Sequence, residues 1–343
     1  MARRTLGTYY SDPPSRGGDA GLRVRDQHWI SFQVDVFLPT LLNGIAVGSL
    51  YALIALGYTM VYGILTFINF AHSDVFVLGA WSSYAITAWA LLHFWPDAAI
   101  PWWGGLMVLP AAMIFCGCVG FTIERLAYRP LRRAPRLNVL ITAIGVSLFL
   151  QNFGQLDFMF GTRPKSMPAL LPNAAPWIKL GQVDVWPVDV LGAGTAVLLM
   201  IALDWLVFHT KIGRAMRAVS FSPQNAALMG IPVDRVISIT FVIGATLAAA
   251  AGFLFAQKYP GLNQPAAAIW VLLGLKAFVA AVVGGIGNIR GAMLGGVLIG
   301  LIEFFGTTYL NDRLRDVYVF SLLILVLLVR PSGILGRAAA DKV

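Results

Sequence analysis

Charged residues are scarce in this chain. Only 12% of its 343 residues are Asp, Glu, Lys or Arg, while 58% are apolar. A soluble fold of this length cannot bury so much apolar surface, so the composition excludes an ordinary soluble enzyme or binding domain. It indicates a single domain with several membrane-spanning segments.

Residues that support metal, redox or nucleotide chemistry are also few. The two cysteines, Cys116 and Cys118, lie in one apolar run, which excludes a disulfide framework and a four-ligand zinc site and favours packing. The four histidines are scattered, without a His-Glu-x-x-His motif or a Ser, His and acid set. The chain also lacks a Gly-Lys-Ser/Thr phosphate loop. We therefore expect no catalytic residues, no metal and no cofactor.

The N-terminal residues lack the apolar core of a signal peptide. Arg3 and Arg4 are followed by a polar stretch that contains Pro and Gly, so we expect 1–35 to be a flexible polar tail, with a short interfacial helix near 29–32. The first apolar segment would then direct the chain to the membrane. We assign 36–337 to one transmembrane domain and 338–343 to a cytoplasmic tail.

Apolar runs with short polar connections fill the rest of the chain. A span needs roughly 20 mainly apolar residues. The run 37–68 is too long for one untilted span, and its glycines at 44, 48, 57 and 63 suggest that it is broken. We predict an all-α polytopic membrane protein with eight to ten transmembrane segments, some of them broken or half-length. The runs are 37–68, 72–95, 102–122, 138–160, 189–209, 236–256, 268–286, 291–310 and 316–330.

Basic residues between the runs predict the orientation. The net charge of +9 is carried in loops and not along one polar face, so topology explains it better than a nucleic-acid partner. The segments 125–136 and 211–235 are therefore predicted to be cytoplasmic. Alternation of the spans places 161–188 and 311–316 outside, and 288–291 and the tail after Arg330 inside. The basic residues of the two cytoplasmic segments are Arg125, Arg129, Arg132, Arg133 and Arg136, then Lys211, Arg214, Arg217 and Arg235.

Three polar residues interrupt the chain between the first two runs. Asn69, His72 and Asp74 are costly in hydrocarbon, so they should face protein, a cavity or the interface. They either mark the membrane surface, where one helix ends and another starts, or line or gate a pathway. The residues alone leave both interpretations open.

Lys276 and Glu303 interrupt two consecutive spans at matching depth. At 1.5 Å per residue, both lie roughly 15–18 Å from the cytoplasmic ends of their spans. One interpretation is a buried ion pair; the other is that Lys276 reaches the interface or a watery cavity while Glu303 is protonated.

The segment 284–300 is rich in glycine. Its glycines do not form a phosphate loop, because the segment opens an apolar span. Gly291, Gly295, Gly296 and Gly300 are instead spaced for close helix packing in a membrane, which we favour over ligand binding.

A short capped helix is predicted over 223–229. Ser222 is a suitable N-cap, Pro223 suits the first helical position, and Gly230 can adopt the left-handed conformation that ends a helix. Pro232 prevents continuation. The basic loop that contains this helix either contacts a cytoplasmic partner or only binds anionic lipid head groups.

Several sequence blocks carry a family resemblance. The segment from Leu42 to His72, which ends in Asn69-Phe-Ala-His72, is similar to the permeases of branched-chain amino acid ABC importers. So are three later blocks, in order along 37–337: Ala227-Leu-Met-Gly-Ile with Thr240-Phe-Val-Ile-Gly-Ala, Leu275-Lys-Ala-Phe with the glycines after it, and Arg330-Pro-Ser-Gly. The chain departs from the family at Ser73, where Gly is usual, and at Phe221 and Ser222, where acidic residues are common.

The resemblance implies a subunit that forms the translocation pathway for branched-chain or related amino acids in a bacterial inner membrane. It implies a second homologous permease, cytoplasmic ATPase subunits that hydrolyse ATP, and an extracytoplasmic solute-binding protein. Lys276 matches the Lys of the family's Lys-Ala-Phe motif, which suggests a role at the pathway. A permease for urea or short amides and an ion-coupled secondary transporter are the alternatives. The residues implied in ATPase coupling are Arg217, Ser222, Pro223, Gln224, Ala226, Ala227 and Gly230.

Overall fold

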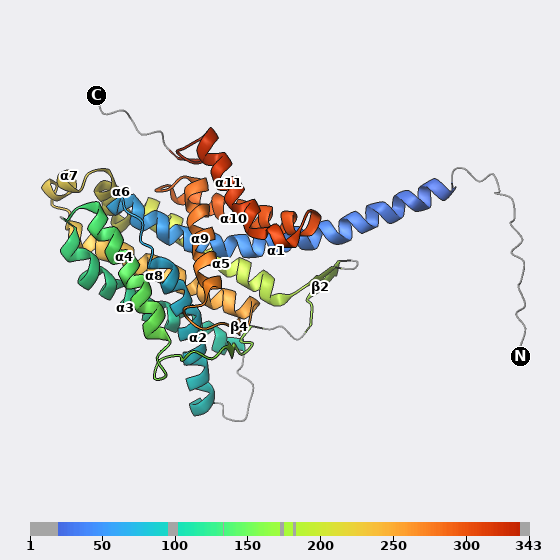
Figure 1. Ribbon diagram of the computed structural model, residues 1–343, viewed down its shortest axis with the longest axis horizontal. Helices are drawn as coiled ribbons and strands as arrows, with labels where there is room; N and C mark the ends of the chain where they lie inside the picture. The colour runs from blue at the N-terminus through green and yellow to red at the C-terminus, as the bar shows by residue number, and fades with distance from the viewer. Residues whose placement is uncertain (1–19, 95–101, 133, 172–174, 181–182, 337–343) are drawn as a thin grey trace, which may run out of the picture.

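The structure is a computed structural model that describes residues 20–94, 102–132, 134–171, 175–180 and 183–336. Helices dominate these residues (Figure 1). The α-helices are α1 (Ala20–Leu65), α2 (His72–Phe94), α3 (Trp102–Ile123), α4 (Arg136–Gly154), α5 (Pro187–His209), α6 (Lys211–Phe221), α7 (Pro223–Leu228), α8 (Val233–Lys258), α9 (Ala268–Gly284), α10 (Ile289–Tyr309) and α11 (Arg315–Val329).

Short elements connect these helices. A π-helix, η1 (Glu124–Tyr128), and a 3₁₀ turn, η2 (Arg129–Leu131), follow α3, and a second 3₁₀ turn, η3 (Asp312–Leu314), precedes α11. Four short strands form two antiparallel pairs in the connections. They are β1 (Lys165–Ser166) with β4 (Gly261–Leu262), and β2 (Ile178–Leu180) with β3 (Val183–Val185).

Several helices have the length and apolar composition of a full span. Within the described residues six qualify, and α9 is apolar but shorter. A helix overlaps every predicted apolar run, so the prediction of an all-α polytopic membrane fold is confirmed. The six are Val36–Leu65, Trp103–Leu131, Leu137–Gly154, Pro187–His209, Val233–Lys258 and Ile289–Tyr309.

The first apolar run forms one continuous helix, so the suggested break at its glycines is wrong. Val36–Leu65 is helical throughout, and the chain leaves the helix only after Leu65. The glycines permit close approach to neighbours instead: a Cβ on Gly48 would lie 2.8 Å from the Val297 Cα. Helix α1 begins at Ala20, inside the segment expected to be a polar tail, whereas 1–19 and 337–343 lie outside the described residues.

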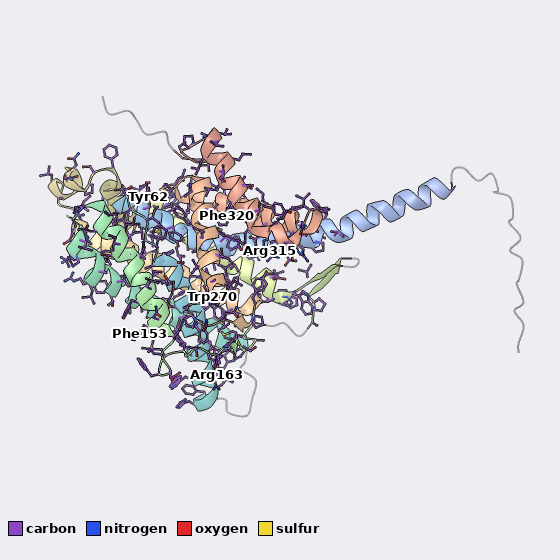
Figure 2. The ribbon with its side chains drawn as sticks, viewed as in Figure 1. Tyr62, Phe153, Arg163, Trp270, Arg315 and Phe320 are labelled. Carbon is purple, nitrogen blue, oxygen red and sulfur yellow. The ribbon has the colours of Figure 1, made fainter. Side chains whose placement is uncertain are left out.

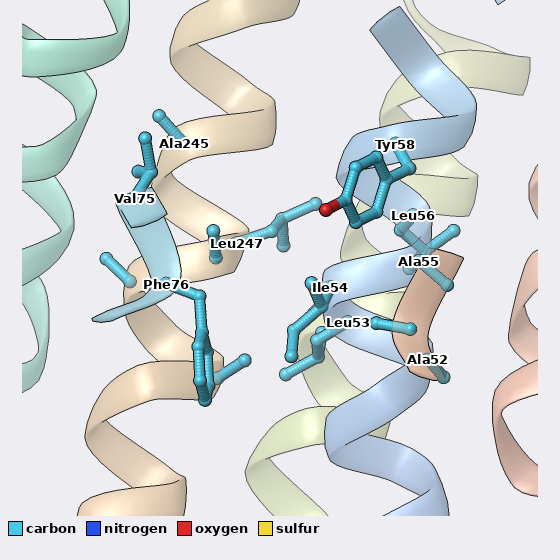
Figure 3. Packing of buried hydrophobic residues seen from close by; sticks show 14 of the residues in the cluster. Ala52, Leu53, Ile54, Ala55, Leu56, Tyr58, Val75, Phe76, Ala245 and Leu247 are labelled. Carbon is cyan, nitrogen blue, oxygen red and sulfur yellow. The ribbon is translucent and has the colours of Figure 1, made fainter. Parts of the chain in front are cut away.

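The core forms around α1 and α8. Helix α1 packs against α8, α9 and α10, and α8 also packs against α2 and α3. Figure 3 shows side chains of α1, α2 and α8 directed into a common cluster, among them Ile54, Phe76 and Leu247. The backbones approach closely, since a Cβ on Gly79 would lie 2.5 Å from the Ala249 Cα. Dense packing of small residues is how helices associate in lipid.

The outer helices present apolar side chains outward. Only 17% of the apolar window of α4 is buried, against 94% for α1. Leu137, Ile141 and Phe149 on α4 are exposed, as are Leu198 and Trp205 on α5. Apolar residues on an outer face suit contact with lipid chains.

The connections predicted to be cytoplasmic gather at one end of the bundle, where Figure 1 shows α6 and α7. Arg290 at the start of α10 pairs with Asp204 near the end of α5. Arg129 after α3 pairs with Asp234 at the start of α8. Segments 124–132, 209–235 and 288–290 therefore share one end, as the predicted alternation requires.

The connections predicted to be outside gather at the other end. There β1 pairs with β4, and the backbone N–H of Leu170 donates to Gln257 Oε1 over 2.8 Å. Lys258 at the end of α8 pairs with Asp189 at the start of α5. The connections that the basic residues assigned to opposite sides of the membrane thus lie at opposite ends of the bundle.

Candidate functional site

A cavity of about 360 Å³ lies between α1, α8, α9, α10 and α11. Its wall combines aromatic and aliphatic side chains with four ionisable residues, and Figure 2 labels Trp270 and Arg315 in its lining. Small-molecule sites typically occupy about 300–1,000 Å³. The lining residues are Val47, Tyr51, Phe255, Tyr259, Gly261, Asn263, Ile269, Trp270, Leu272, Leu273, Lys276, Glu303, Phe304, Arg315 and Asp316.

The ionisable residues form a connected cluster. Lys276 Nζ lies 2.9 Å from Glu303 Oε1 and 2.7 Å from Asp316 Oδ1. Arg315 Nε lies 3.6 Å from the same Glu303 oxygen. The structure therefore contains the Lys276–Glu303 ion pair that was one of the two alternatives for these residues. At this separation the attraction between the opposite charges counteracts the cost of burying Lys276 and Glu303.

The cluster has a buried half and an exposed half. The side chains of Lys276 and Glu303 are 5% and 3% exposed, whereas those of Arg315 and Asp316 are 46% and 47% exposed. The second carboxylate oxygen of Glu303, Oε2, has no hydrogen-bond partner within the described residues. The cavity thus holds a buried carboxylate oxygen without a direct donor, although the Tyr51 hydroxyl lies beside the same carboxylate.

Arg315 and Asp316 were not identified as site residues from the sequence. They were counted only as part of an outside connection at 311–316, next to Asp312 and Arg313. Their contribution depends on where α11 packs, because Asp316 reaches Lys276 on α9 and Arg315 reaches Glu303 on α10. The concentration of four charged residues within 312–316, at the start of a span, was the available signal.

Asn69, His72 and Asp74 are buried within the protein and do not line this cavity. The Tyr128 hydroxyl donates to Asn69 Oδ1 over 2.6 Å. Gln151 Nε2 donates to Asp74 Oδ1 over 2.9 Å, while Asp74 Oδ2 has no partner among the described residues. These contacts join the start of α2 to α4 and η1.

His72 lies against the middle of α1. Its Nε2 is 3.2 Å from the Ile54 carbonyl oxygen, which requires Nε2 to carry the proton for a hydrogen bond. Its ring contacts Tyr58 edge to face, with 4.8 Å between ring centroids. The chain after Leu65 therefore folds back beside α1, so that α2 starts beside the interior of the bundle.

Helix α7 has the caps that the sequence predicted. Ser222 Oγ accepts from the Asn225 N–H over 3.2 Å, Pro223 occupies the first turn, and Gly230 has φ +77°. Helix α7 ends at Leu228 with Met229 as its C-cap. The predicted helix over 223–229 therefore agrees with the observed one to within a residue.

The surface around α7 is apolar and exposed. Phe221, Leu228 and Met229 are 90%, 85% and 82% exposed. Ala226 is buried against the chain, so it does not contribute to this surface, whereas Ala227 and Gln224 are exposed. Exposed patches of large apolar side chains are typical of surfaces that contact either another protein or the membrane.

Arg217 belongs to a different contact. It lies on α6, a helix that the sequence analysis did not predict, with its guanidinium 5.2 Å from the Phe208 ring centroid. Arg290 lies over the same ring at 4.7 Å. Helix α6 was overlooked because its basic residues were used only for topology, although Met216 and Val219 are buried at helical spacing.

Four glycines of α10, at positions 291, 295, 296 and 300, divide between two neighbours. A Cβ on Gly296 would lie 2.4 Å from the Ala52 Cα, and one on Gly300 would lie 2.4 Å from the Gly44 oxygen, both on α1. On the other side, Gly291 and Gly295 lie against the Gly284 and Ala280 oxygens of α9. These glycines let α10 fit between α1 and α9, which places Glu303 beside Lys276.

Among the described residues, no group of three or more His, Cys, Asp or Glu is arranged to hold a metal ion. The cavity between α9, α10 and α11 instead combines cations, carboxylates and apolar side chains. Such a surface suits a small molecule that carries charged groups of both signs and an apolar part.

Known proteins similar to this chain are transport permeases. The permease protein LivH of the high-affinity branched-chain amino acid transport system of Escherichia coli (strain K12) is 43% identical over 326 residues, covering 92% of this chain and 100% of that protein. The corresponding permease protein BraD of Pseudomonas aeruginosa is 44% identical over 313 residues, covering 90% and 98%. A probable branched-chain amino acid transport permease protein LivH of Methanocaldococcus jannaschii is 27% identical over 308 residues, covering 86% and 91%.

No solved structure is similar enough to count as a match. The model of one family, described as "Branched-chain amino acid transport system / permease component", matches residues 40–329. The match includes the cavity, its ion cluster, the glycines of α10 and helix α7. The chain therefore belongs to the family of branched-chain amino acid transport permease components.

Proposed function

We propose that this chain is the permease subunit of an ATP-driven ABC importer and forms the translocation pathway for branched-chain amino acids. The observation that carries the proposal is the 43% identity to the E. coli permease along the whole length of that protein. The proposal places the chain in the bacterial inner membrane, surrounded by lipid. It also assigns eight to ten membrane segments, of which α2, α9 and α11 supplement the six full-length spans.

The proposed partners are a second homologous permease, cytoplasmic ATPase subunits and an extracytoplasmic solute-binding protein. The ATPase would bind α7, where Phe221, Leu228 and Met229 are exposed at the end that carries the basic connections. Ser222, Pro223 and Gly230 give α7 its ends, and Gln224 and Ala227 lie on its open surface. Arg217 would hold α6, the helix before α7, against α5 through its contact with Phe208.

Motion of α7 would reach the membrane part through α8. The backbone continues from Gly230 into α8, whose Asp234 pairs with Arg129 and Arg132. Two-state movement of packed helices is a common way to switch a pathway between outward-open and inward-open arrangements. Asn69, His72 and Asp74 are proposed as gating residues, since they hold the start of α2, and Lys276 and Glu303 as pathway residues.

The test is uptake by the assembled complex. The chain is co-expressed with the second permease, the ATPases and the binding protein of its own genome. The purified complex is then reconstituted in vesicles, with ATP supplied on the side that carries the ATPases. ATP-dependent uptake of labelled leucine, isoleucine and valine is expected, insensitive to ionophores. Uptake of urea or acetamide in preference to these solutes would replace the proposed substrate, and uptake driven by an ion gradient without ATPases would overturn the proposal.

A further inference from the structure

We infer that the cavity formed by Lys276, Glu303, Arg315 and Asp316 is a binding site, within the permease itself, for the zwitterionic backbone of an amino acid. The inference rests on the proposed function, because that function supplies the solute. To that function it adds the location of the solute site and the residues that bind each charged group of the solute. The site lies toward the end of the bundle at which α10 ends and α11 begins, away from α7.

Charge balance favours a zwitterion. The charged residues that line the cavity are two cations and two carboxylates, so the lining is neutral as a whole. Asp312, which pairs with Arg315 over 3.3 Å, is largely exposed and does not line the cavity. A zwitterion adds one charge of each sign and keeps the balance, whereas a lone anion or cation leaves one unit of charge beside the buried side chains of Lys276 and Glu303. Unpaired charge in such surroundings is costly, so this cluster discriminates against singly charged solutes.

Glu303 is the residue placed to receive the ammonium group. Its side chain is 3% exposed, and its Oε2 has no hydrogen-bond partner among the described residues while Oε1 takes the ion pair with Lys276. Tyr51, next to this carboxylate, is buried and interacts with it. An ammonium group provides the donors that a buried carboxylate oxygen lacks, and charge-assisted hydrogen bonds of this kind are strong.

Arg315 is the residue placed to receive the carboxylate. It is about half exposed at the rim, its contacts with Asp312 and Glu303 are long, at 3.3 Å and 3.6 Å, and its guanidinium lies 6.0 Å from the Phe304 ring centroid. A guanidinium with donors to spare can bind a carboxylate through two parallel hydrogen bonds. An arriving solute would therefore meet Arg315 and Asp316 first and Glu303 afterwards.

The remaining wall suits a branched aliphatic side chain. Val47, Ile269 and Leu273 are aliphatic, and Phe255 and Trp270 add aromatic faces. These residues come from α1, α8 and α9, so the apolar part of the wall lies across three helices. The apolar wall and the ion cluster share one cavity, which matches the two chemical halves of leucine, isoleucine or valine.

The test measures binding of labelled leucine to the purified full-length chain in lipid nanodiscs, with two competitors that each lack one charged group. 3-Methylbutylamine lacks the carboxylate, and 4-methylpentanoate lacks the ammonium group. Glu303→Gln should weaken leucine and the amine by about tenfold to a hundredfold, the range expected for a lost charged hydrogen bond, and should not weaken the acid, because the lining then carries a net positive charge. Arg315→Gln should weaken leucine and the acid and should not weaken the amine, because the lining then carries a net negative charge.

Arg313→Gln is the matched control, since Arg313 is exposed in the same turn and does not line the cavity. A merely structural role for Glu303 or Arg315 would weaken all three ligands together, which would overturn the inference, as would unchanged binding in both variants. Saturable uptake by the complete complex without leucine binding to the chain would overturn the inference and leave the proposed function intact. Leucine binding by a chain whose complex imports no branched-chain amino acid would overturn the proposed function alone.

Discussion

Gly57 on α1 lies directly beneath the imidazole ring of His72 at the start of α2. A Cβ built on Gly57 would stand 2.1 Å from His72 Nε2, the atom that hydrogen-bonds to the Ile54 carbonyl. No side chain larger than hydrogen fits there without moving the ring. This contact fixes where the chain re-enters the bundle after α1 and so positions Asp74 for Gln151.

The first prediction is that Gly57→Ala destabilises the protein by about 1–3 kcal/mol, the usual cost of overpacking a core. The ring of His72 is held between Tyr58 and the α1 backbone, so it cannot move aside freely. Chemical unfolding of the purified chain in mixed micelles measures the loss. Gly145→Ala on α4 is the control, because a Cβ there meets nothing within 4 Å, and equal effects of the two changes would contradict the assigned contact.

The second prediction concerns the ion cluster. Lys276→Met removes the cation that pairs with both Glu303 and Asp316, and breaking a buried pair from one side typically costs about 3–5 kcal/mol. The double change Lys276→Met with Glu303→Gln should cost less than the single change, because it leaves no stranded buried carboxylate. The coupling from a double-mutant cycle is expected within about 0.5–3 kcal/mol. Additive losses would show that the two side chains do not act as a pair.

The third prediction is that the exposed surface of α7 serves coupling and not folding. Ala227→Trp should leave membrane insertion and the unfolding midpoint unchanged, since Ala227 is exposed, but should abolish solute-stimulated ATPase activity of the assembled complex. Leu228→Ser should weaken co-purification of the ATPase. Leu310→Ser is the control, an apolar residue that is 76% exposed at the opposite end. Unchanged stimulation in Ala227→Trp would remove α7 from the coupling mechanism.

The fourth prediction is that the purified chain alone neither binds nor hydrolyses ATP, because it lacks a phosphate-binding loop. Equilibrium dialysis with labelled ATP and a phosphate-release assay measure both activities. The assembled complex, with its ATPase subunits, is the positive control. Saturable binding of ATP to the isolated chain would contradict this prediction.

Local signals explain what could be predicted from the sequence. Helix α7 followed from Ser222, Pro223 and Gly230, because capping depends on neighbouring residues only. The Lys276–Glu303 pair was one of two alternatives, because consecutive antiparallel spans of known length place their residues at comparable depth.

The features that could not be predicted from the sequence depend on how the helices pack against one another. Arg315 and Asp316 join the cavity only because α11 packs beside α9 and α10, and nothing near them in the sequence specifies that contact. The glycines of α1 were interpreted as a break, since a glycine that permits close approach resembles one that ends a helix until its neighbour is known. Burial of Ala226 likewise depends on how α7 lies against α6 and α8.

The last prediction separates two arginines that bind the same carboxylate. Arg129 and Arg132 both pair with Asp234, whose side chain is 57% exposed, but only Arg132 also pairs with Glu124, which is fully buried in the π-helix after α3. Glu124 has one further partner, the Ser238 hydroxyl, which donates to Oε2 over 2.6 Å. Removing Arg132 therefore strands a buried charge, whereas removing Arg129 weakens an exposed pair.

Arg132→Met should accordingly cost about 3–5 kcal/mol of unfolding free energy, and Arg129→Met about 0–1 kcal/mol. Unfolding of the two variants in the same micelles gives the comparison, and salt should diminish only the smaller effect because exposed pairs are screened. Adding Glu124→Gln to Arg132→Met should restore part of the loss, since a neutral amide needs no cation. Equal losses in the two single variants, or no recovery in the double variant, would mean that Glu124 does not depend on Arg132 and that the junction of α3 and α8 is held by packing alone.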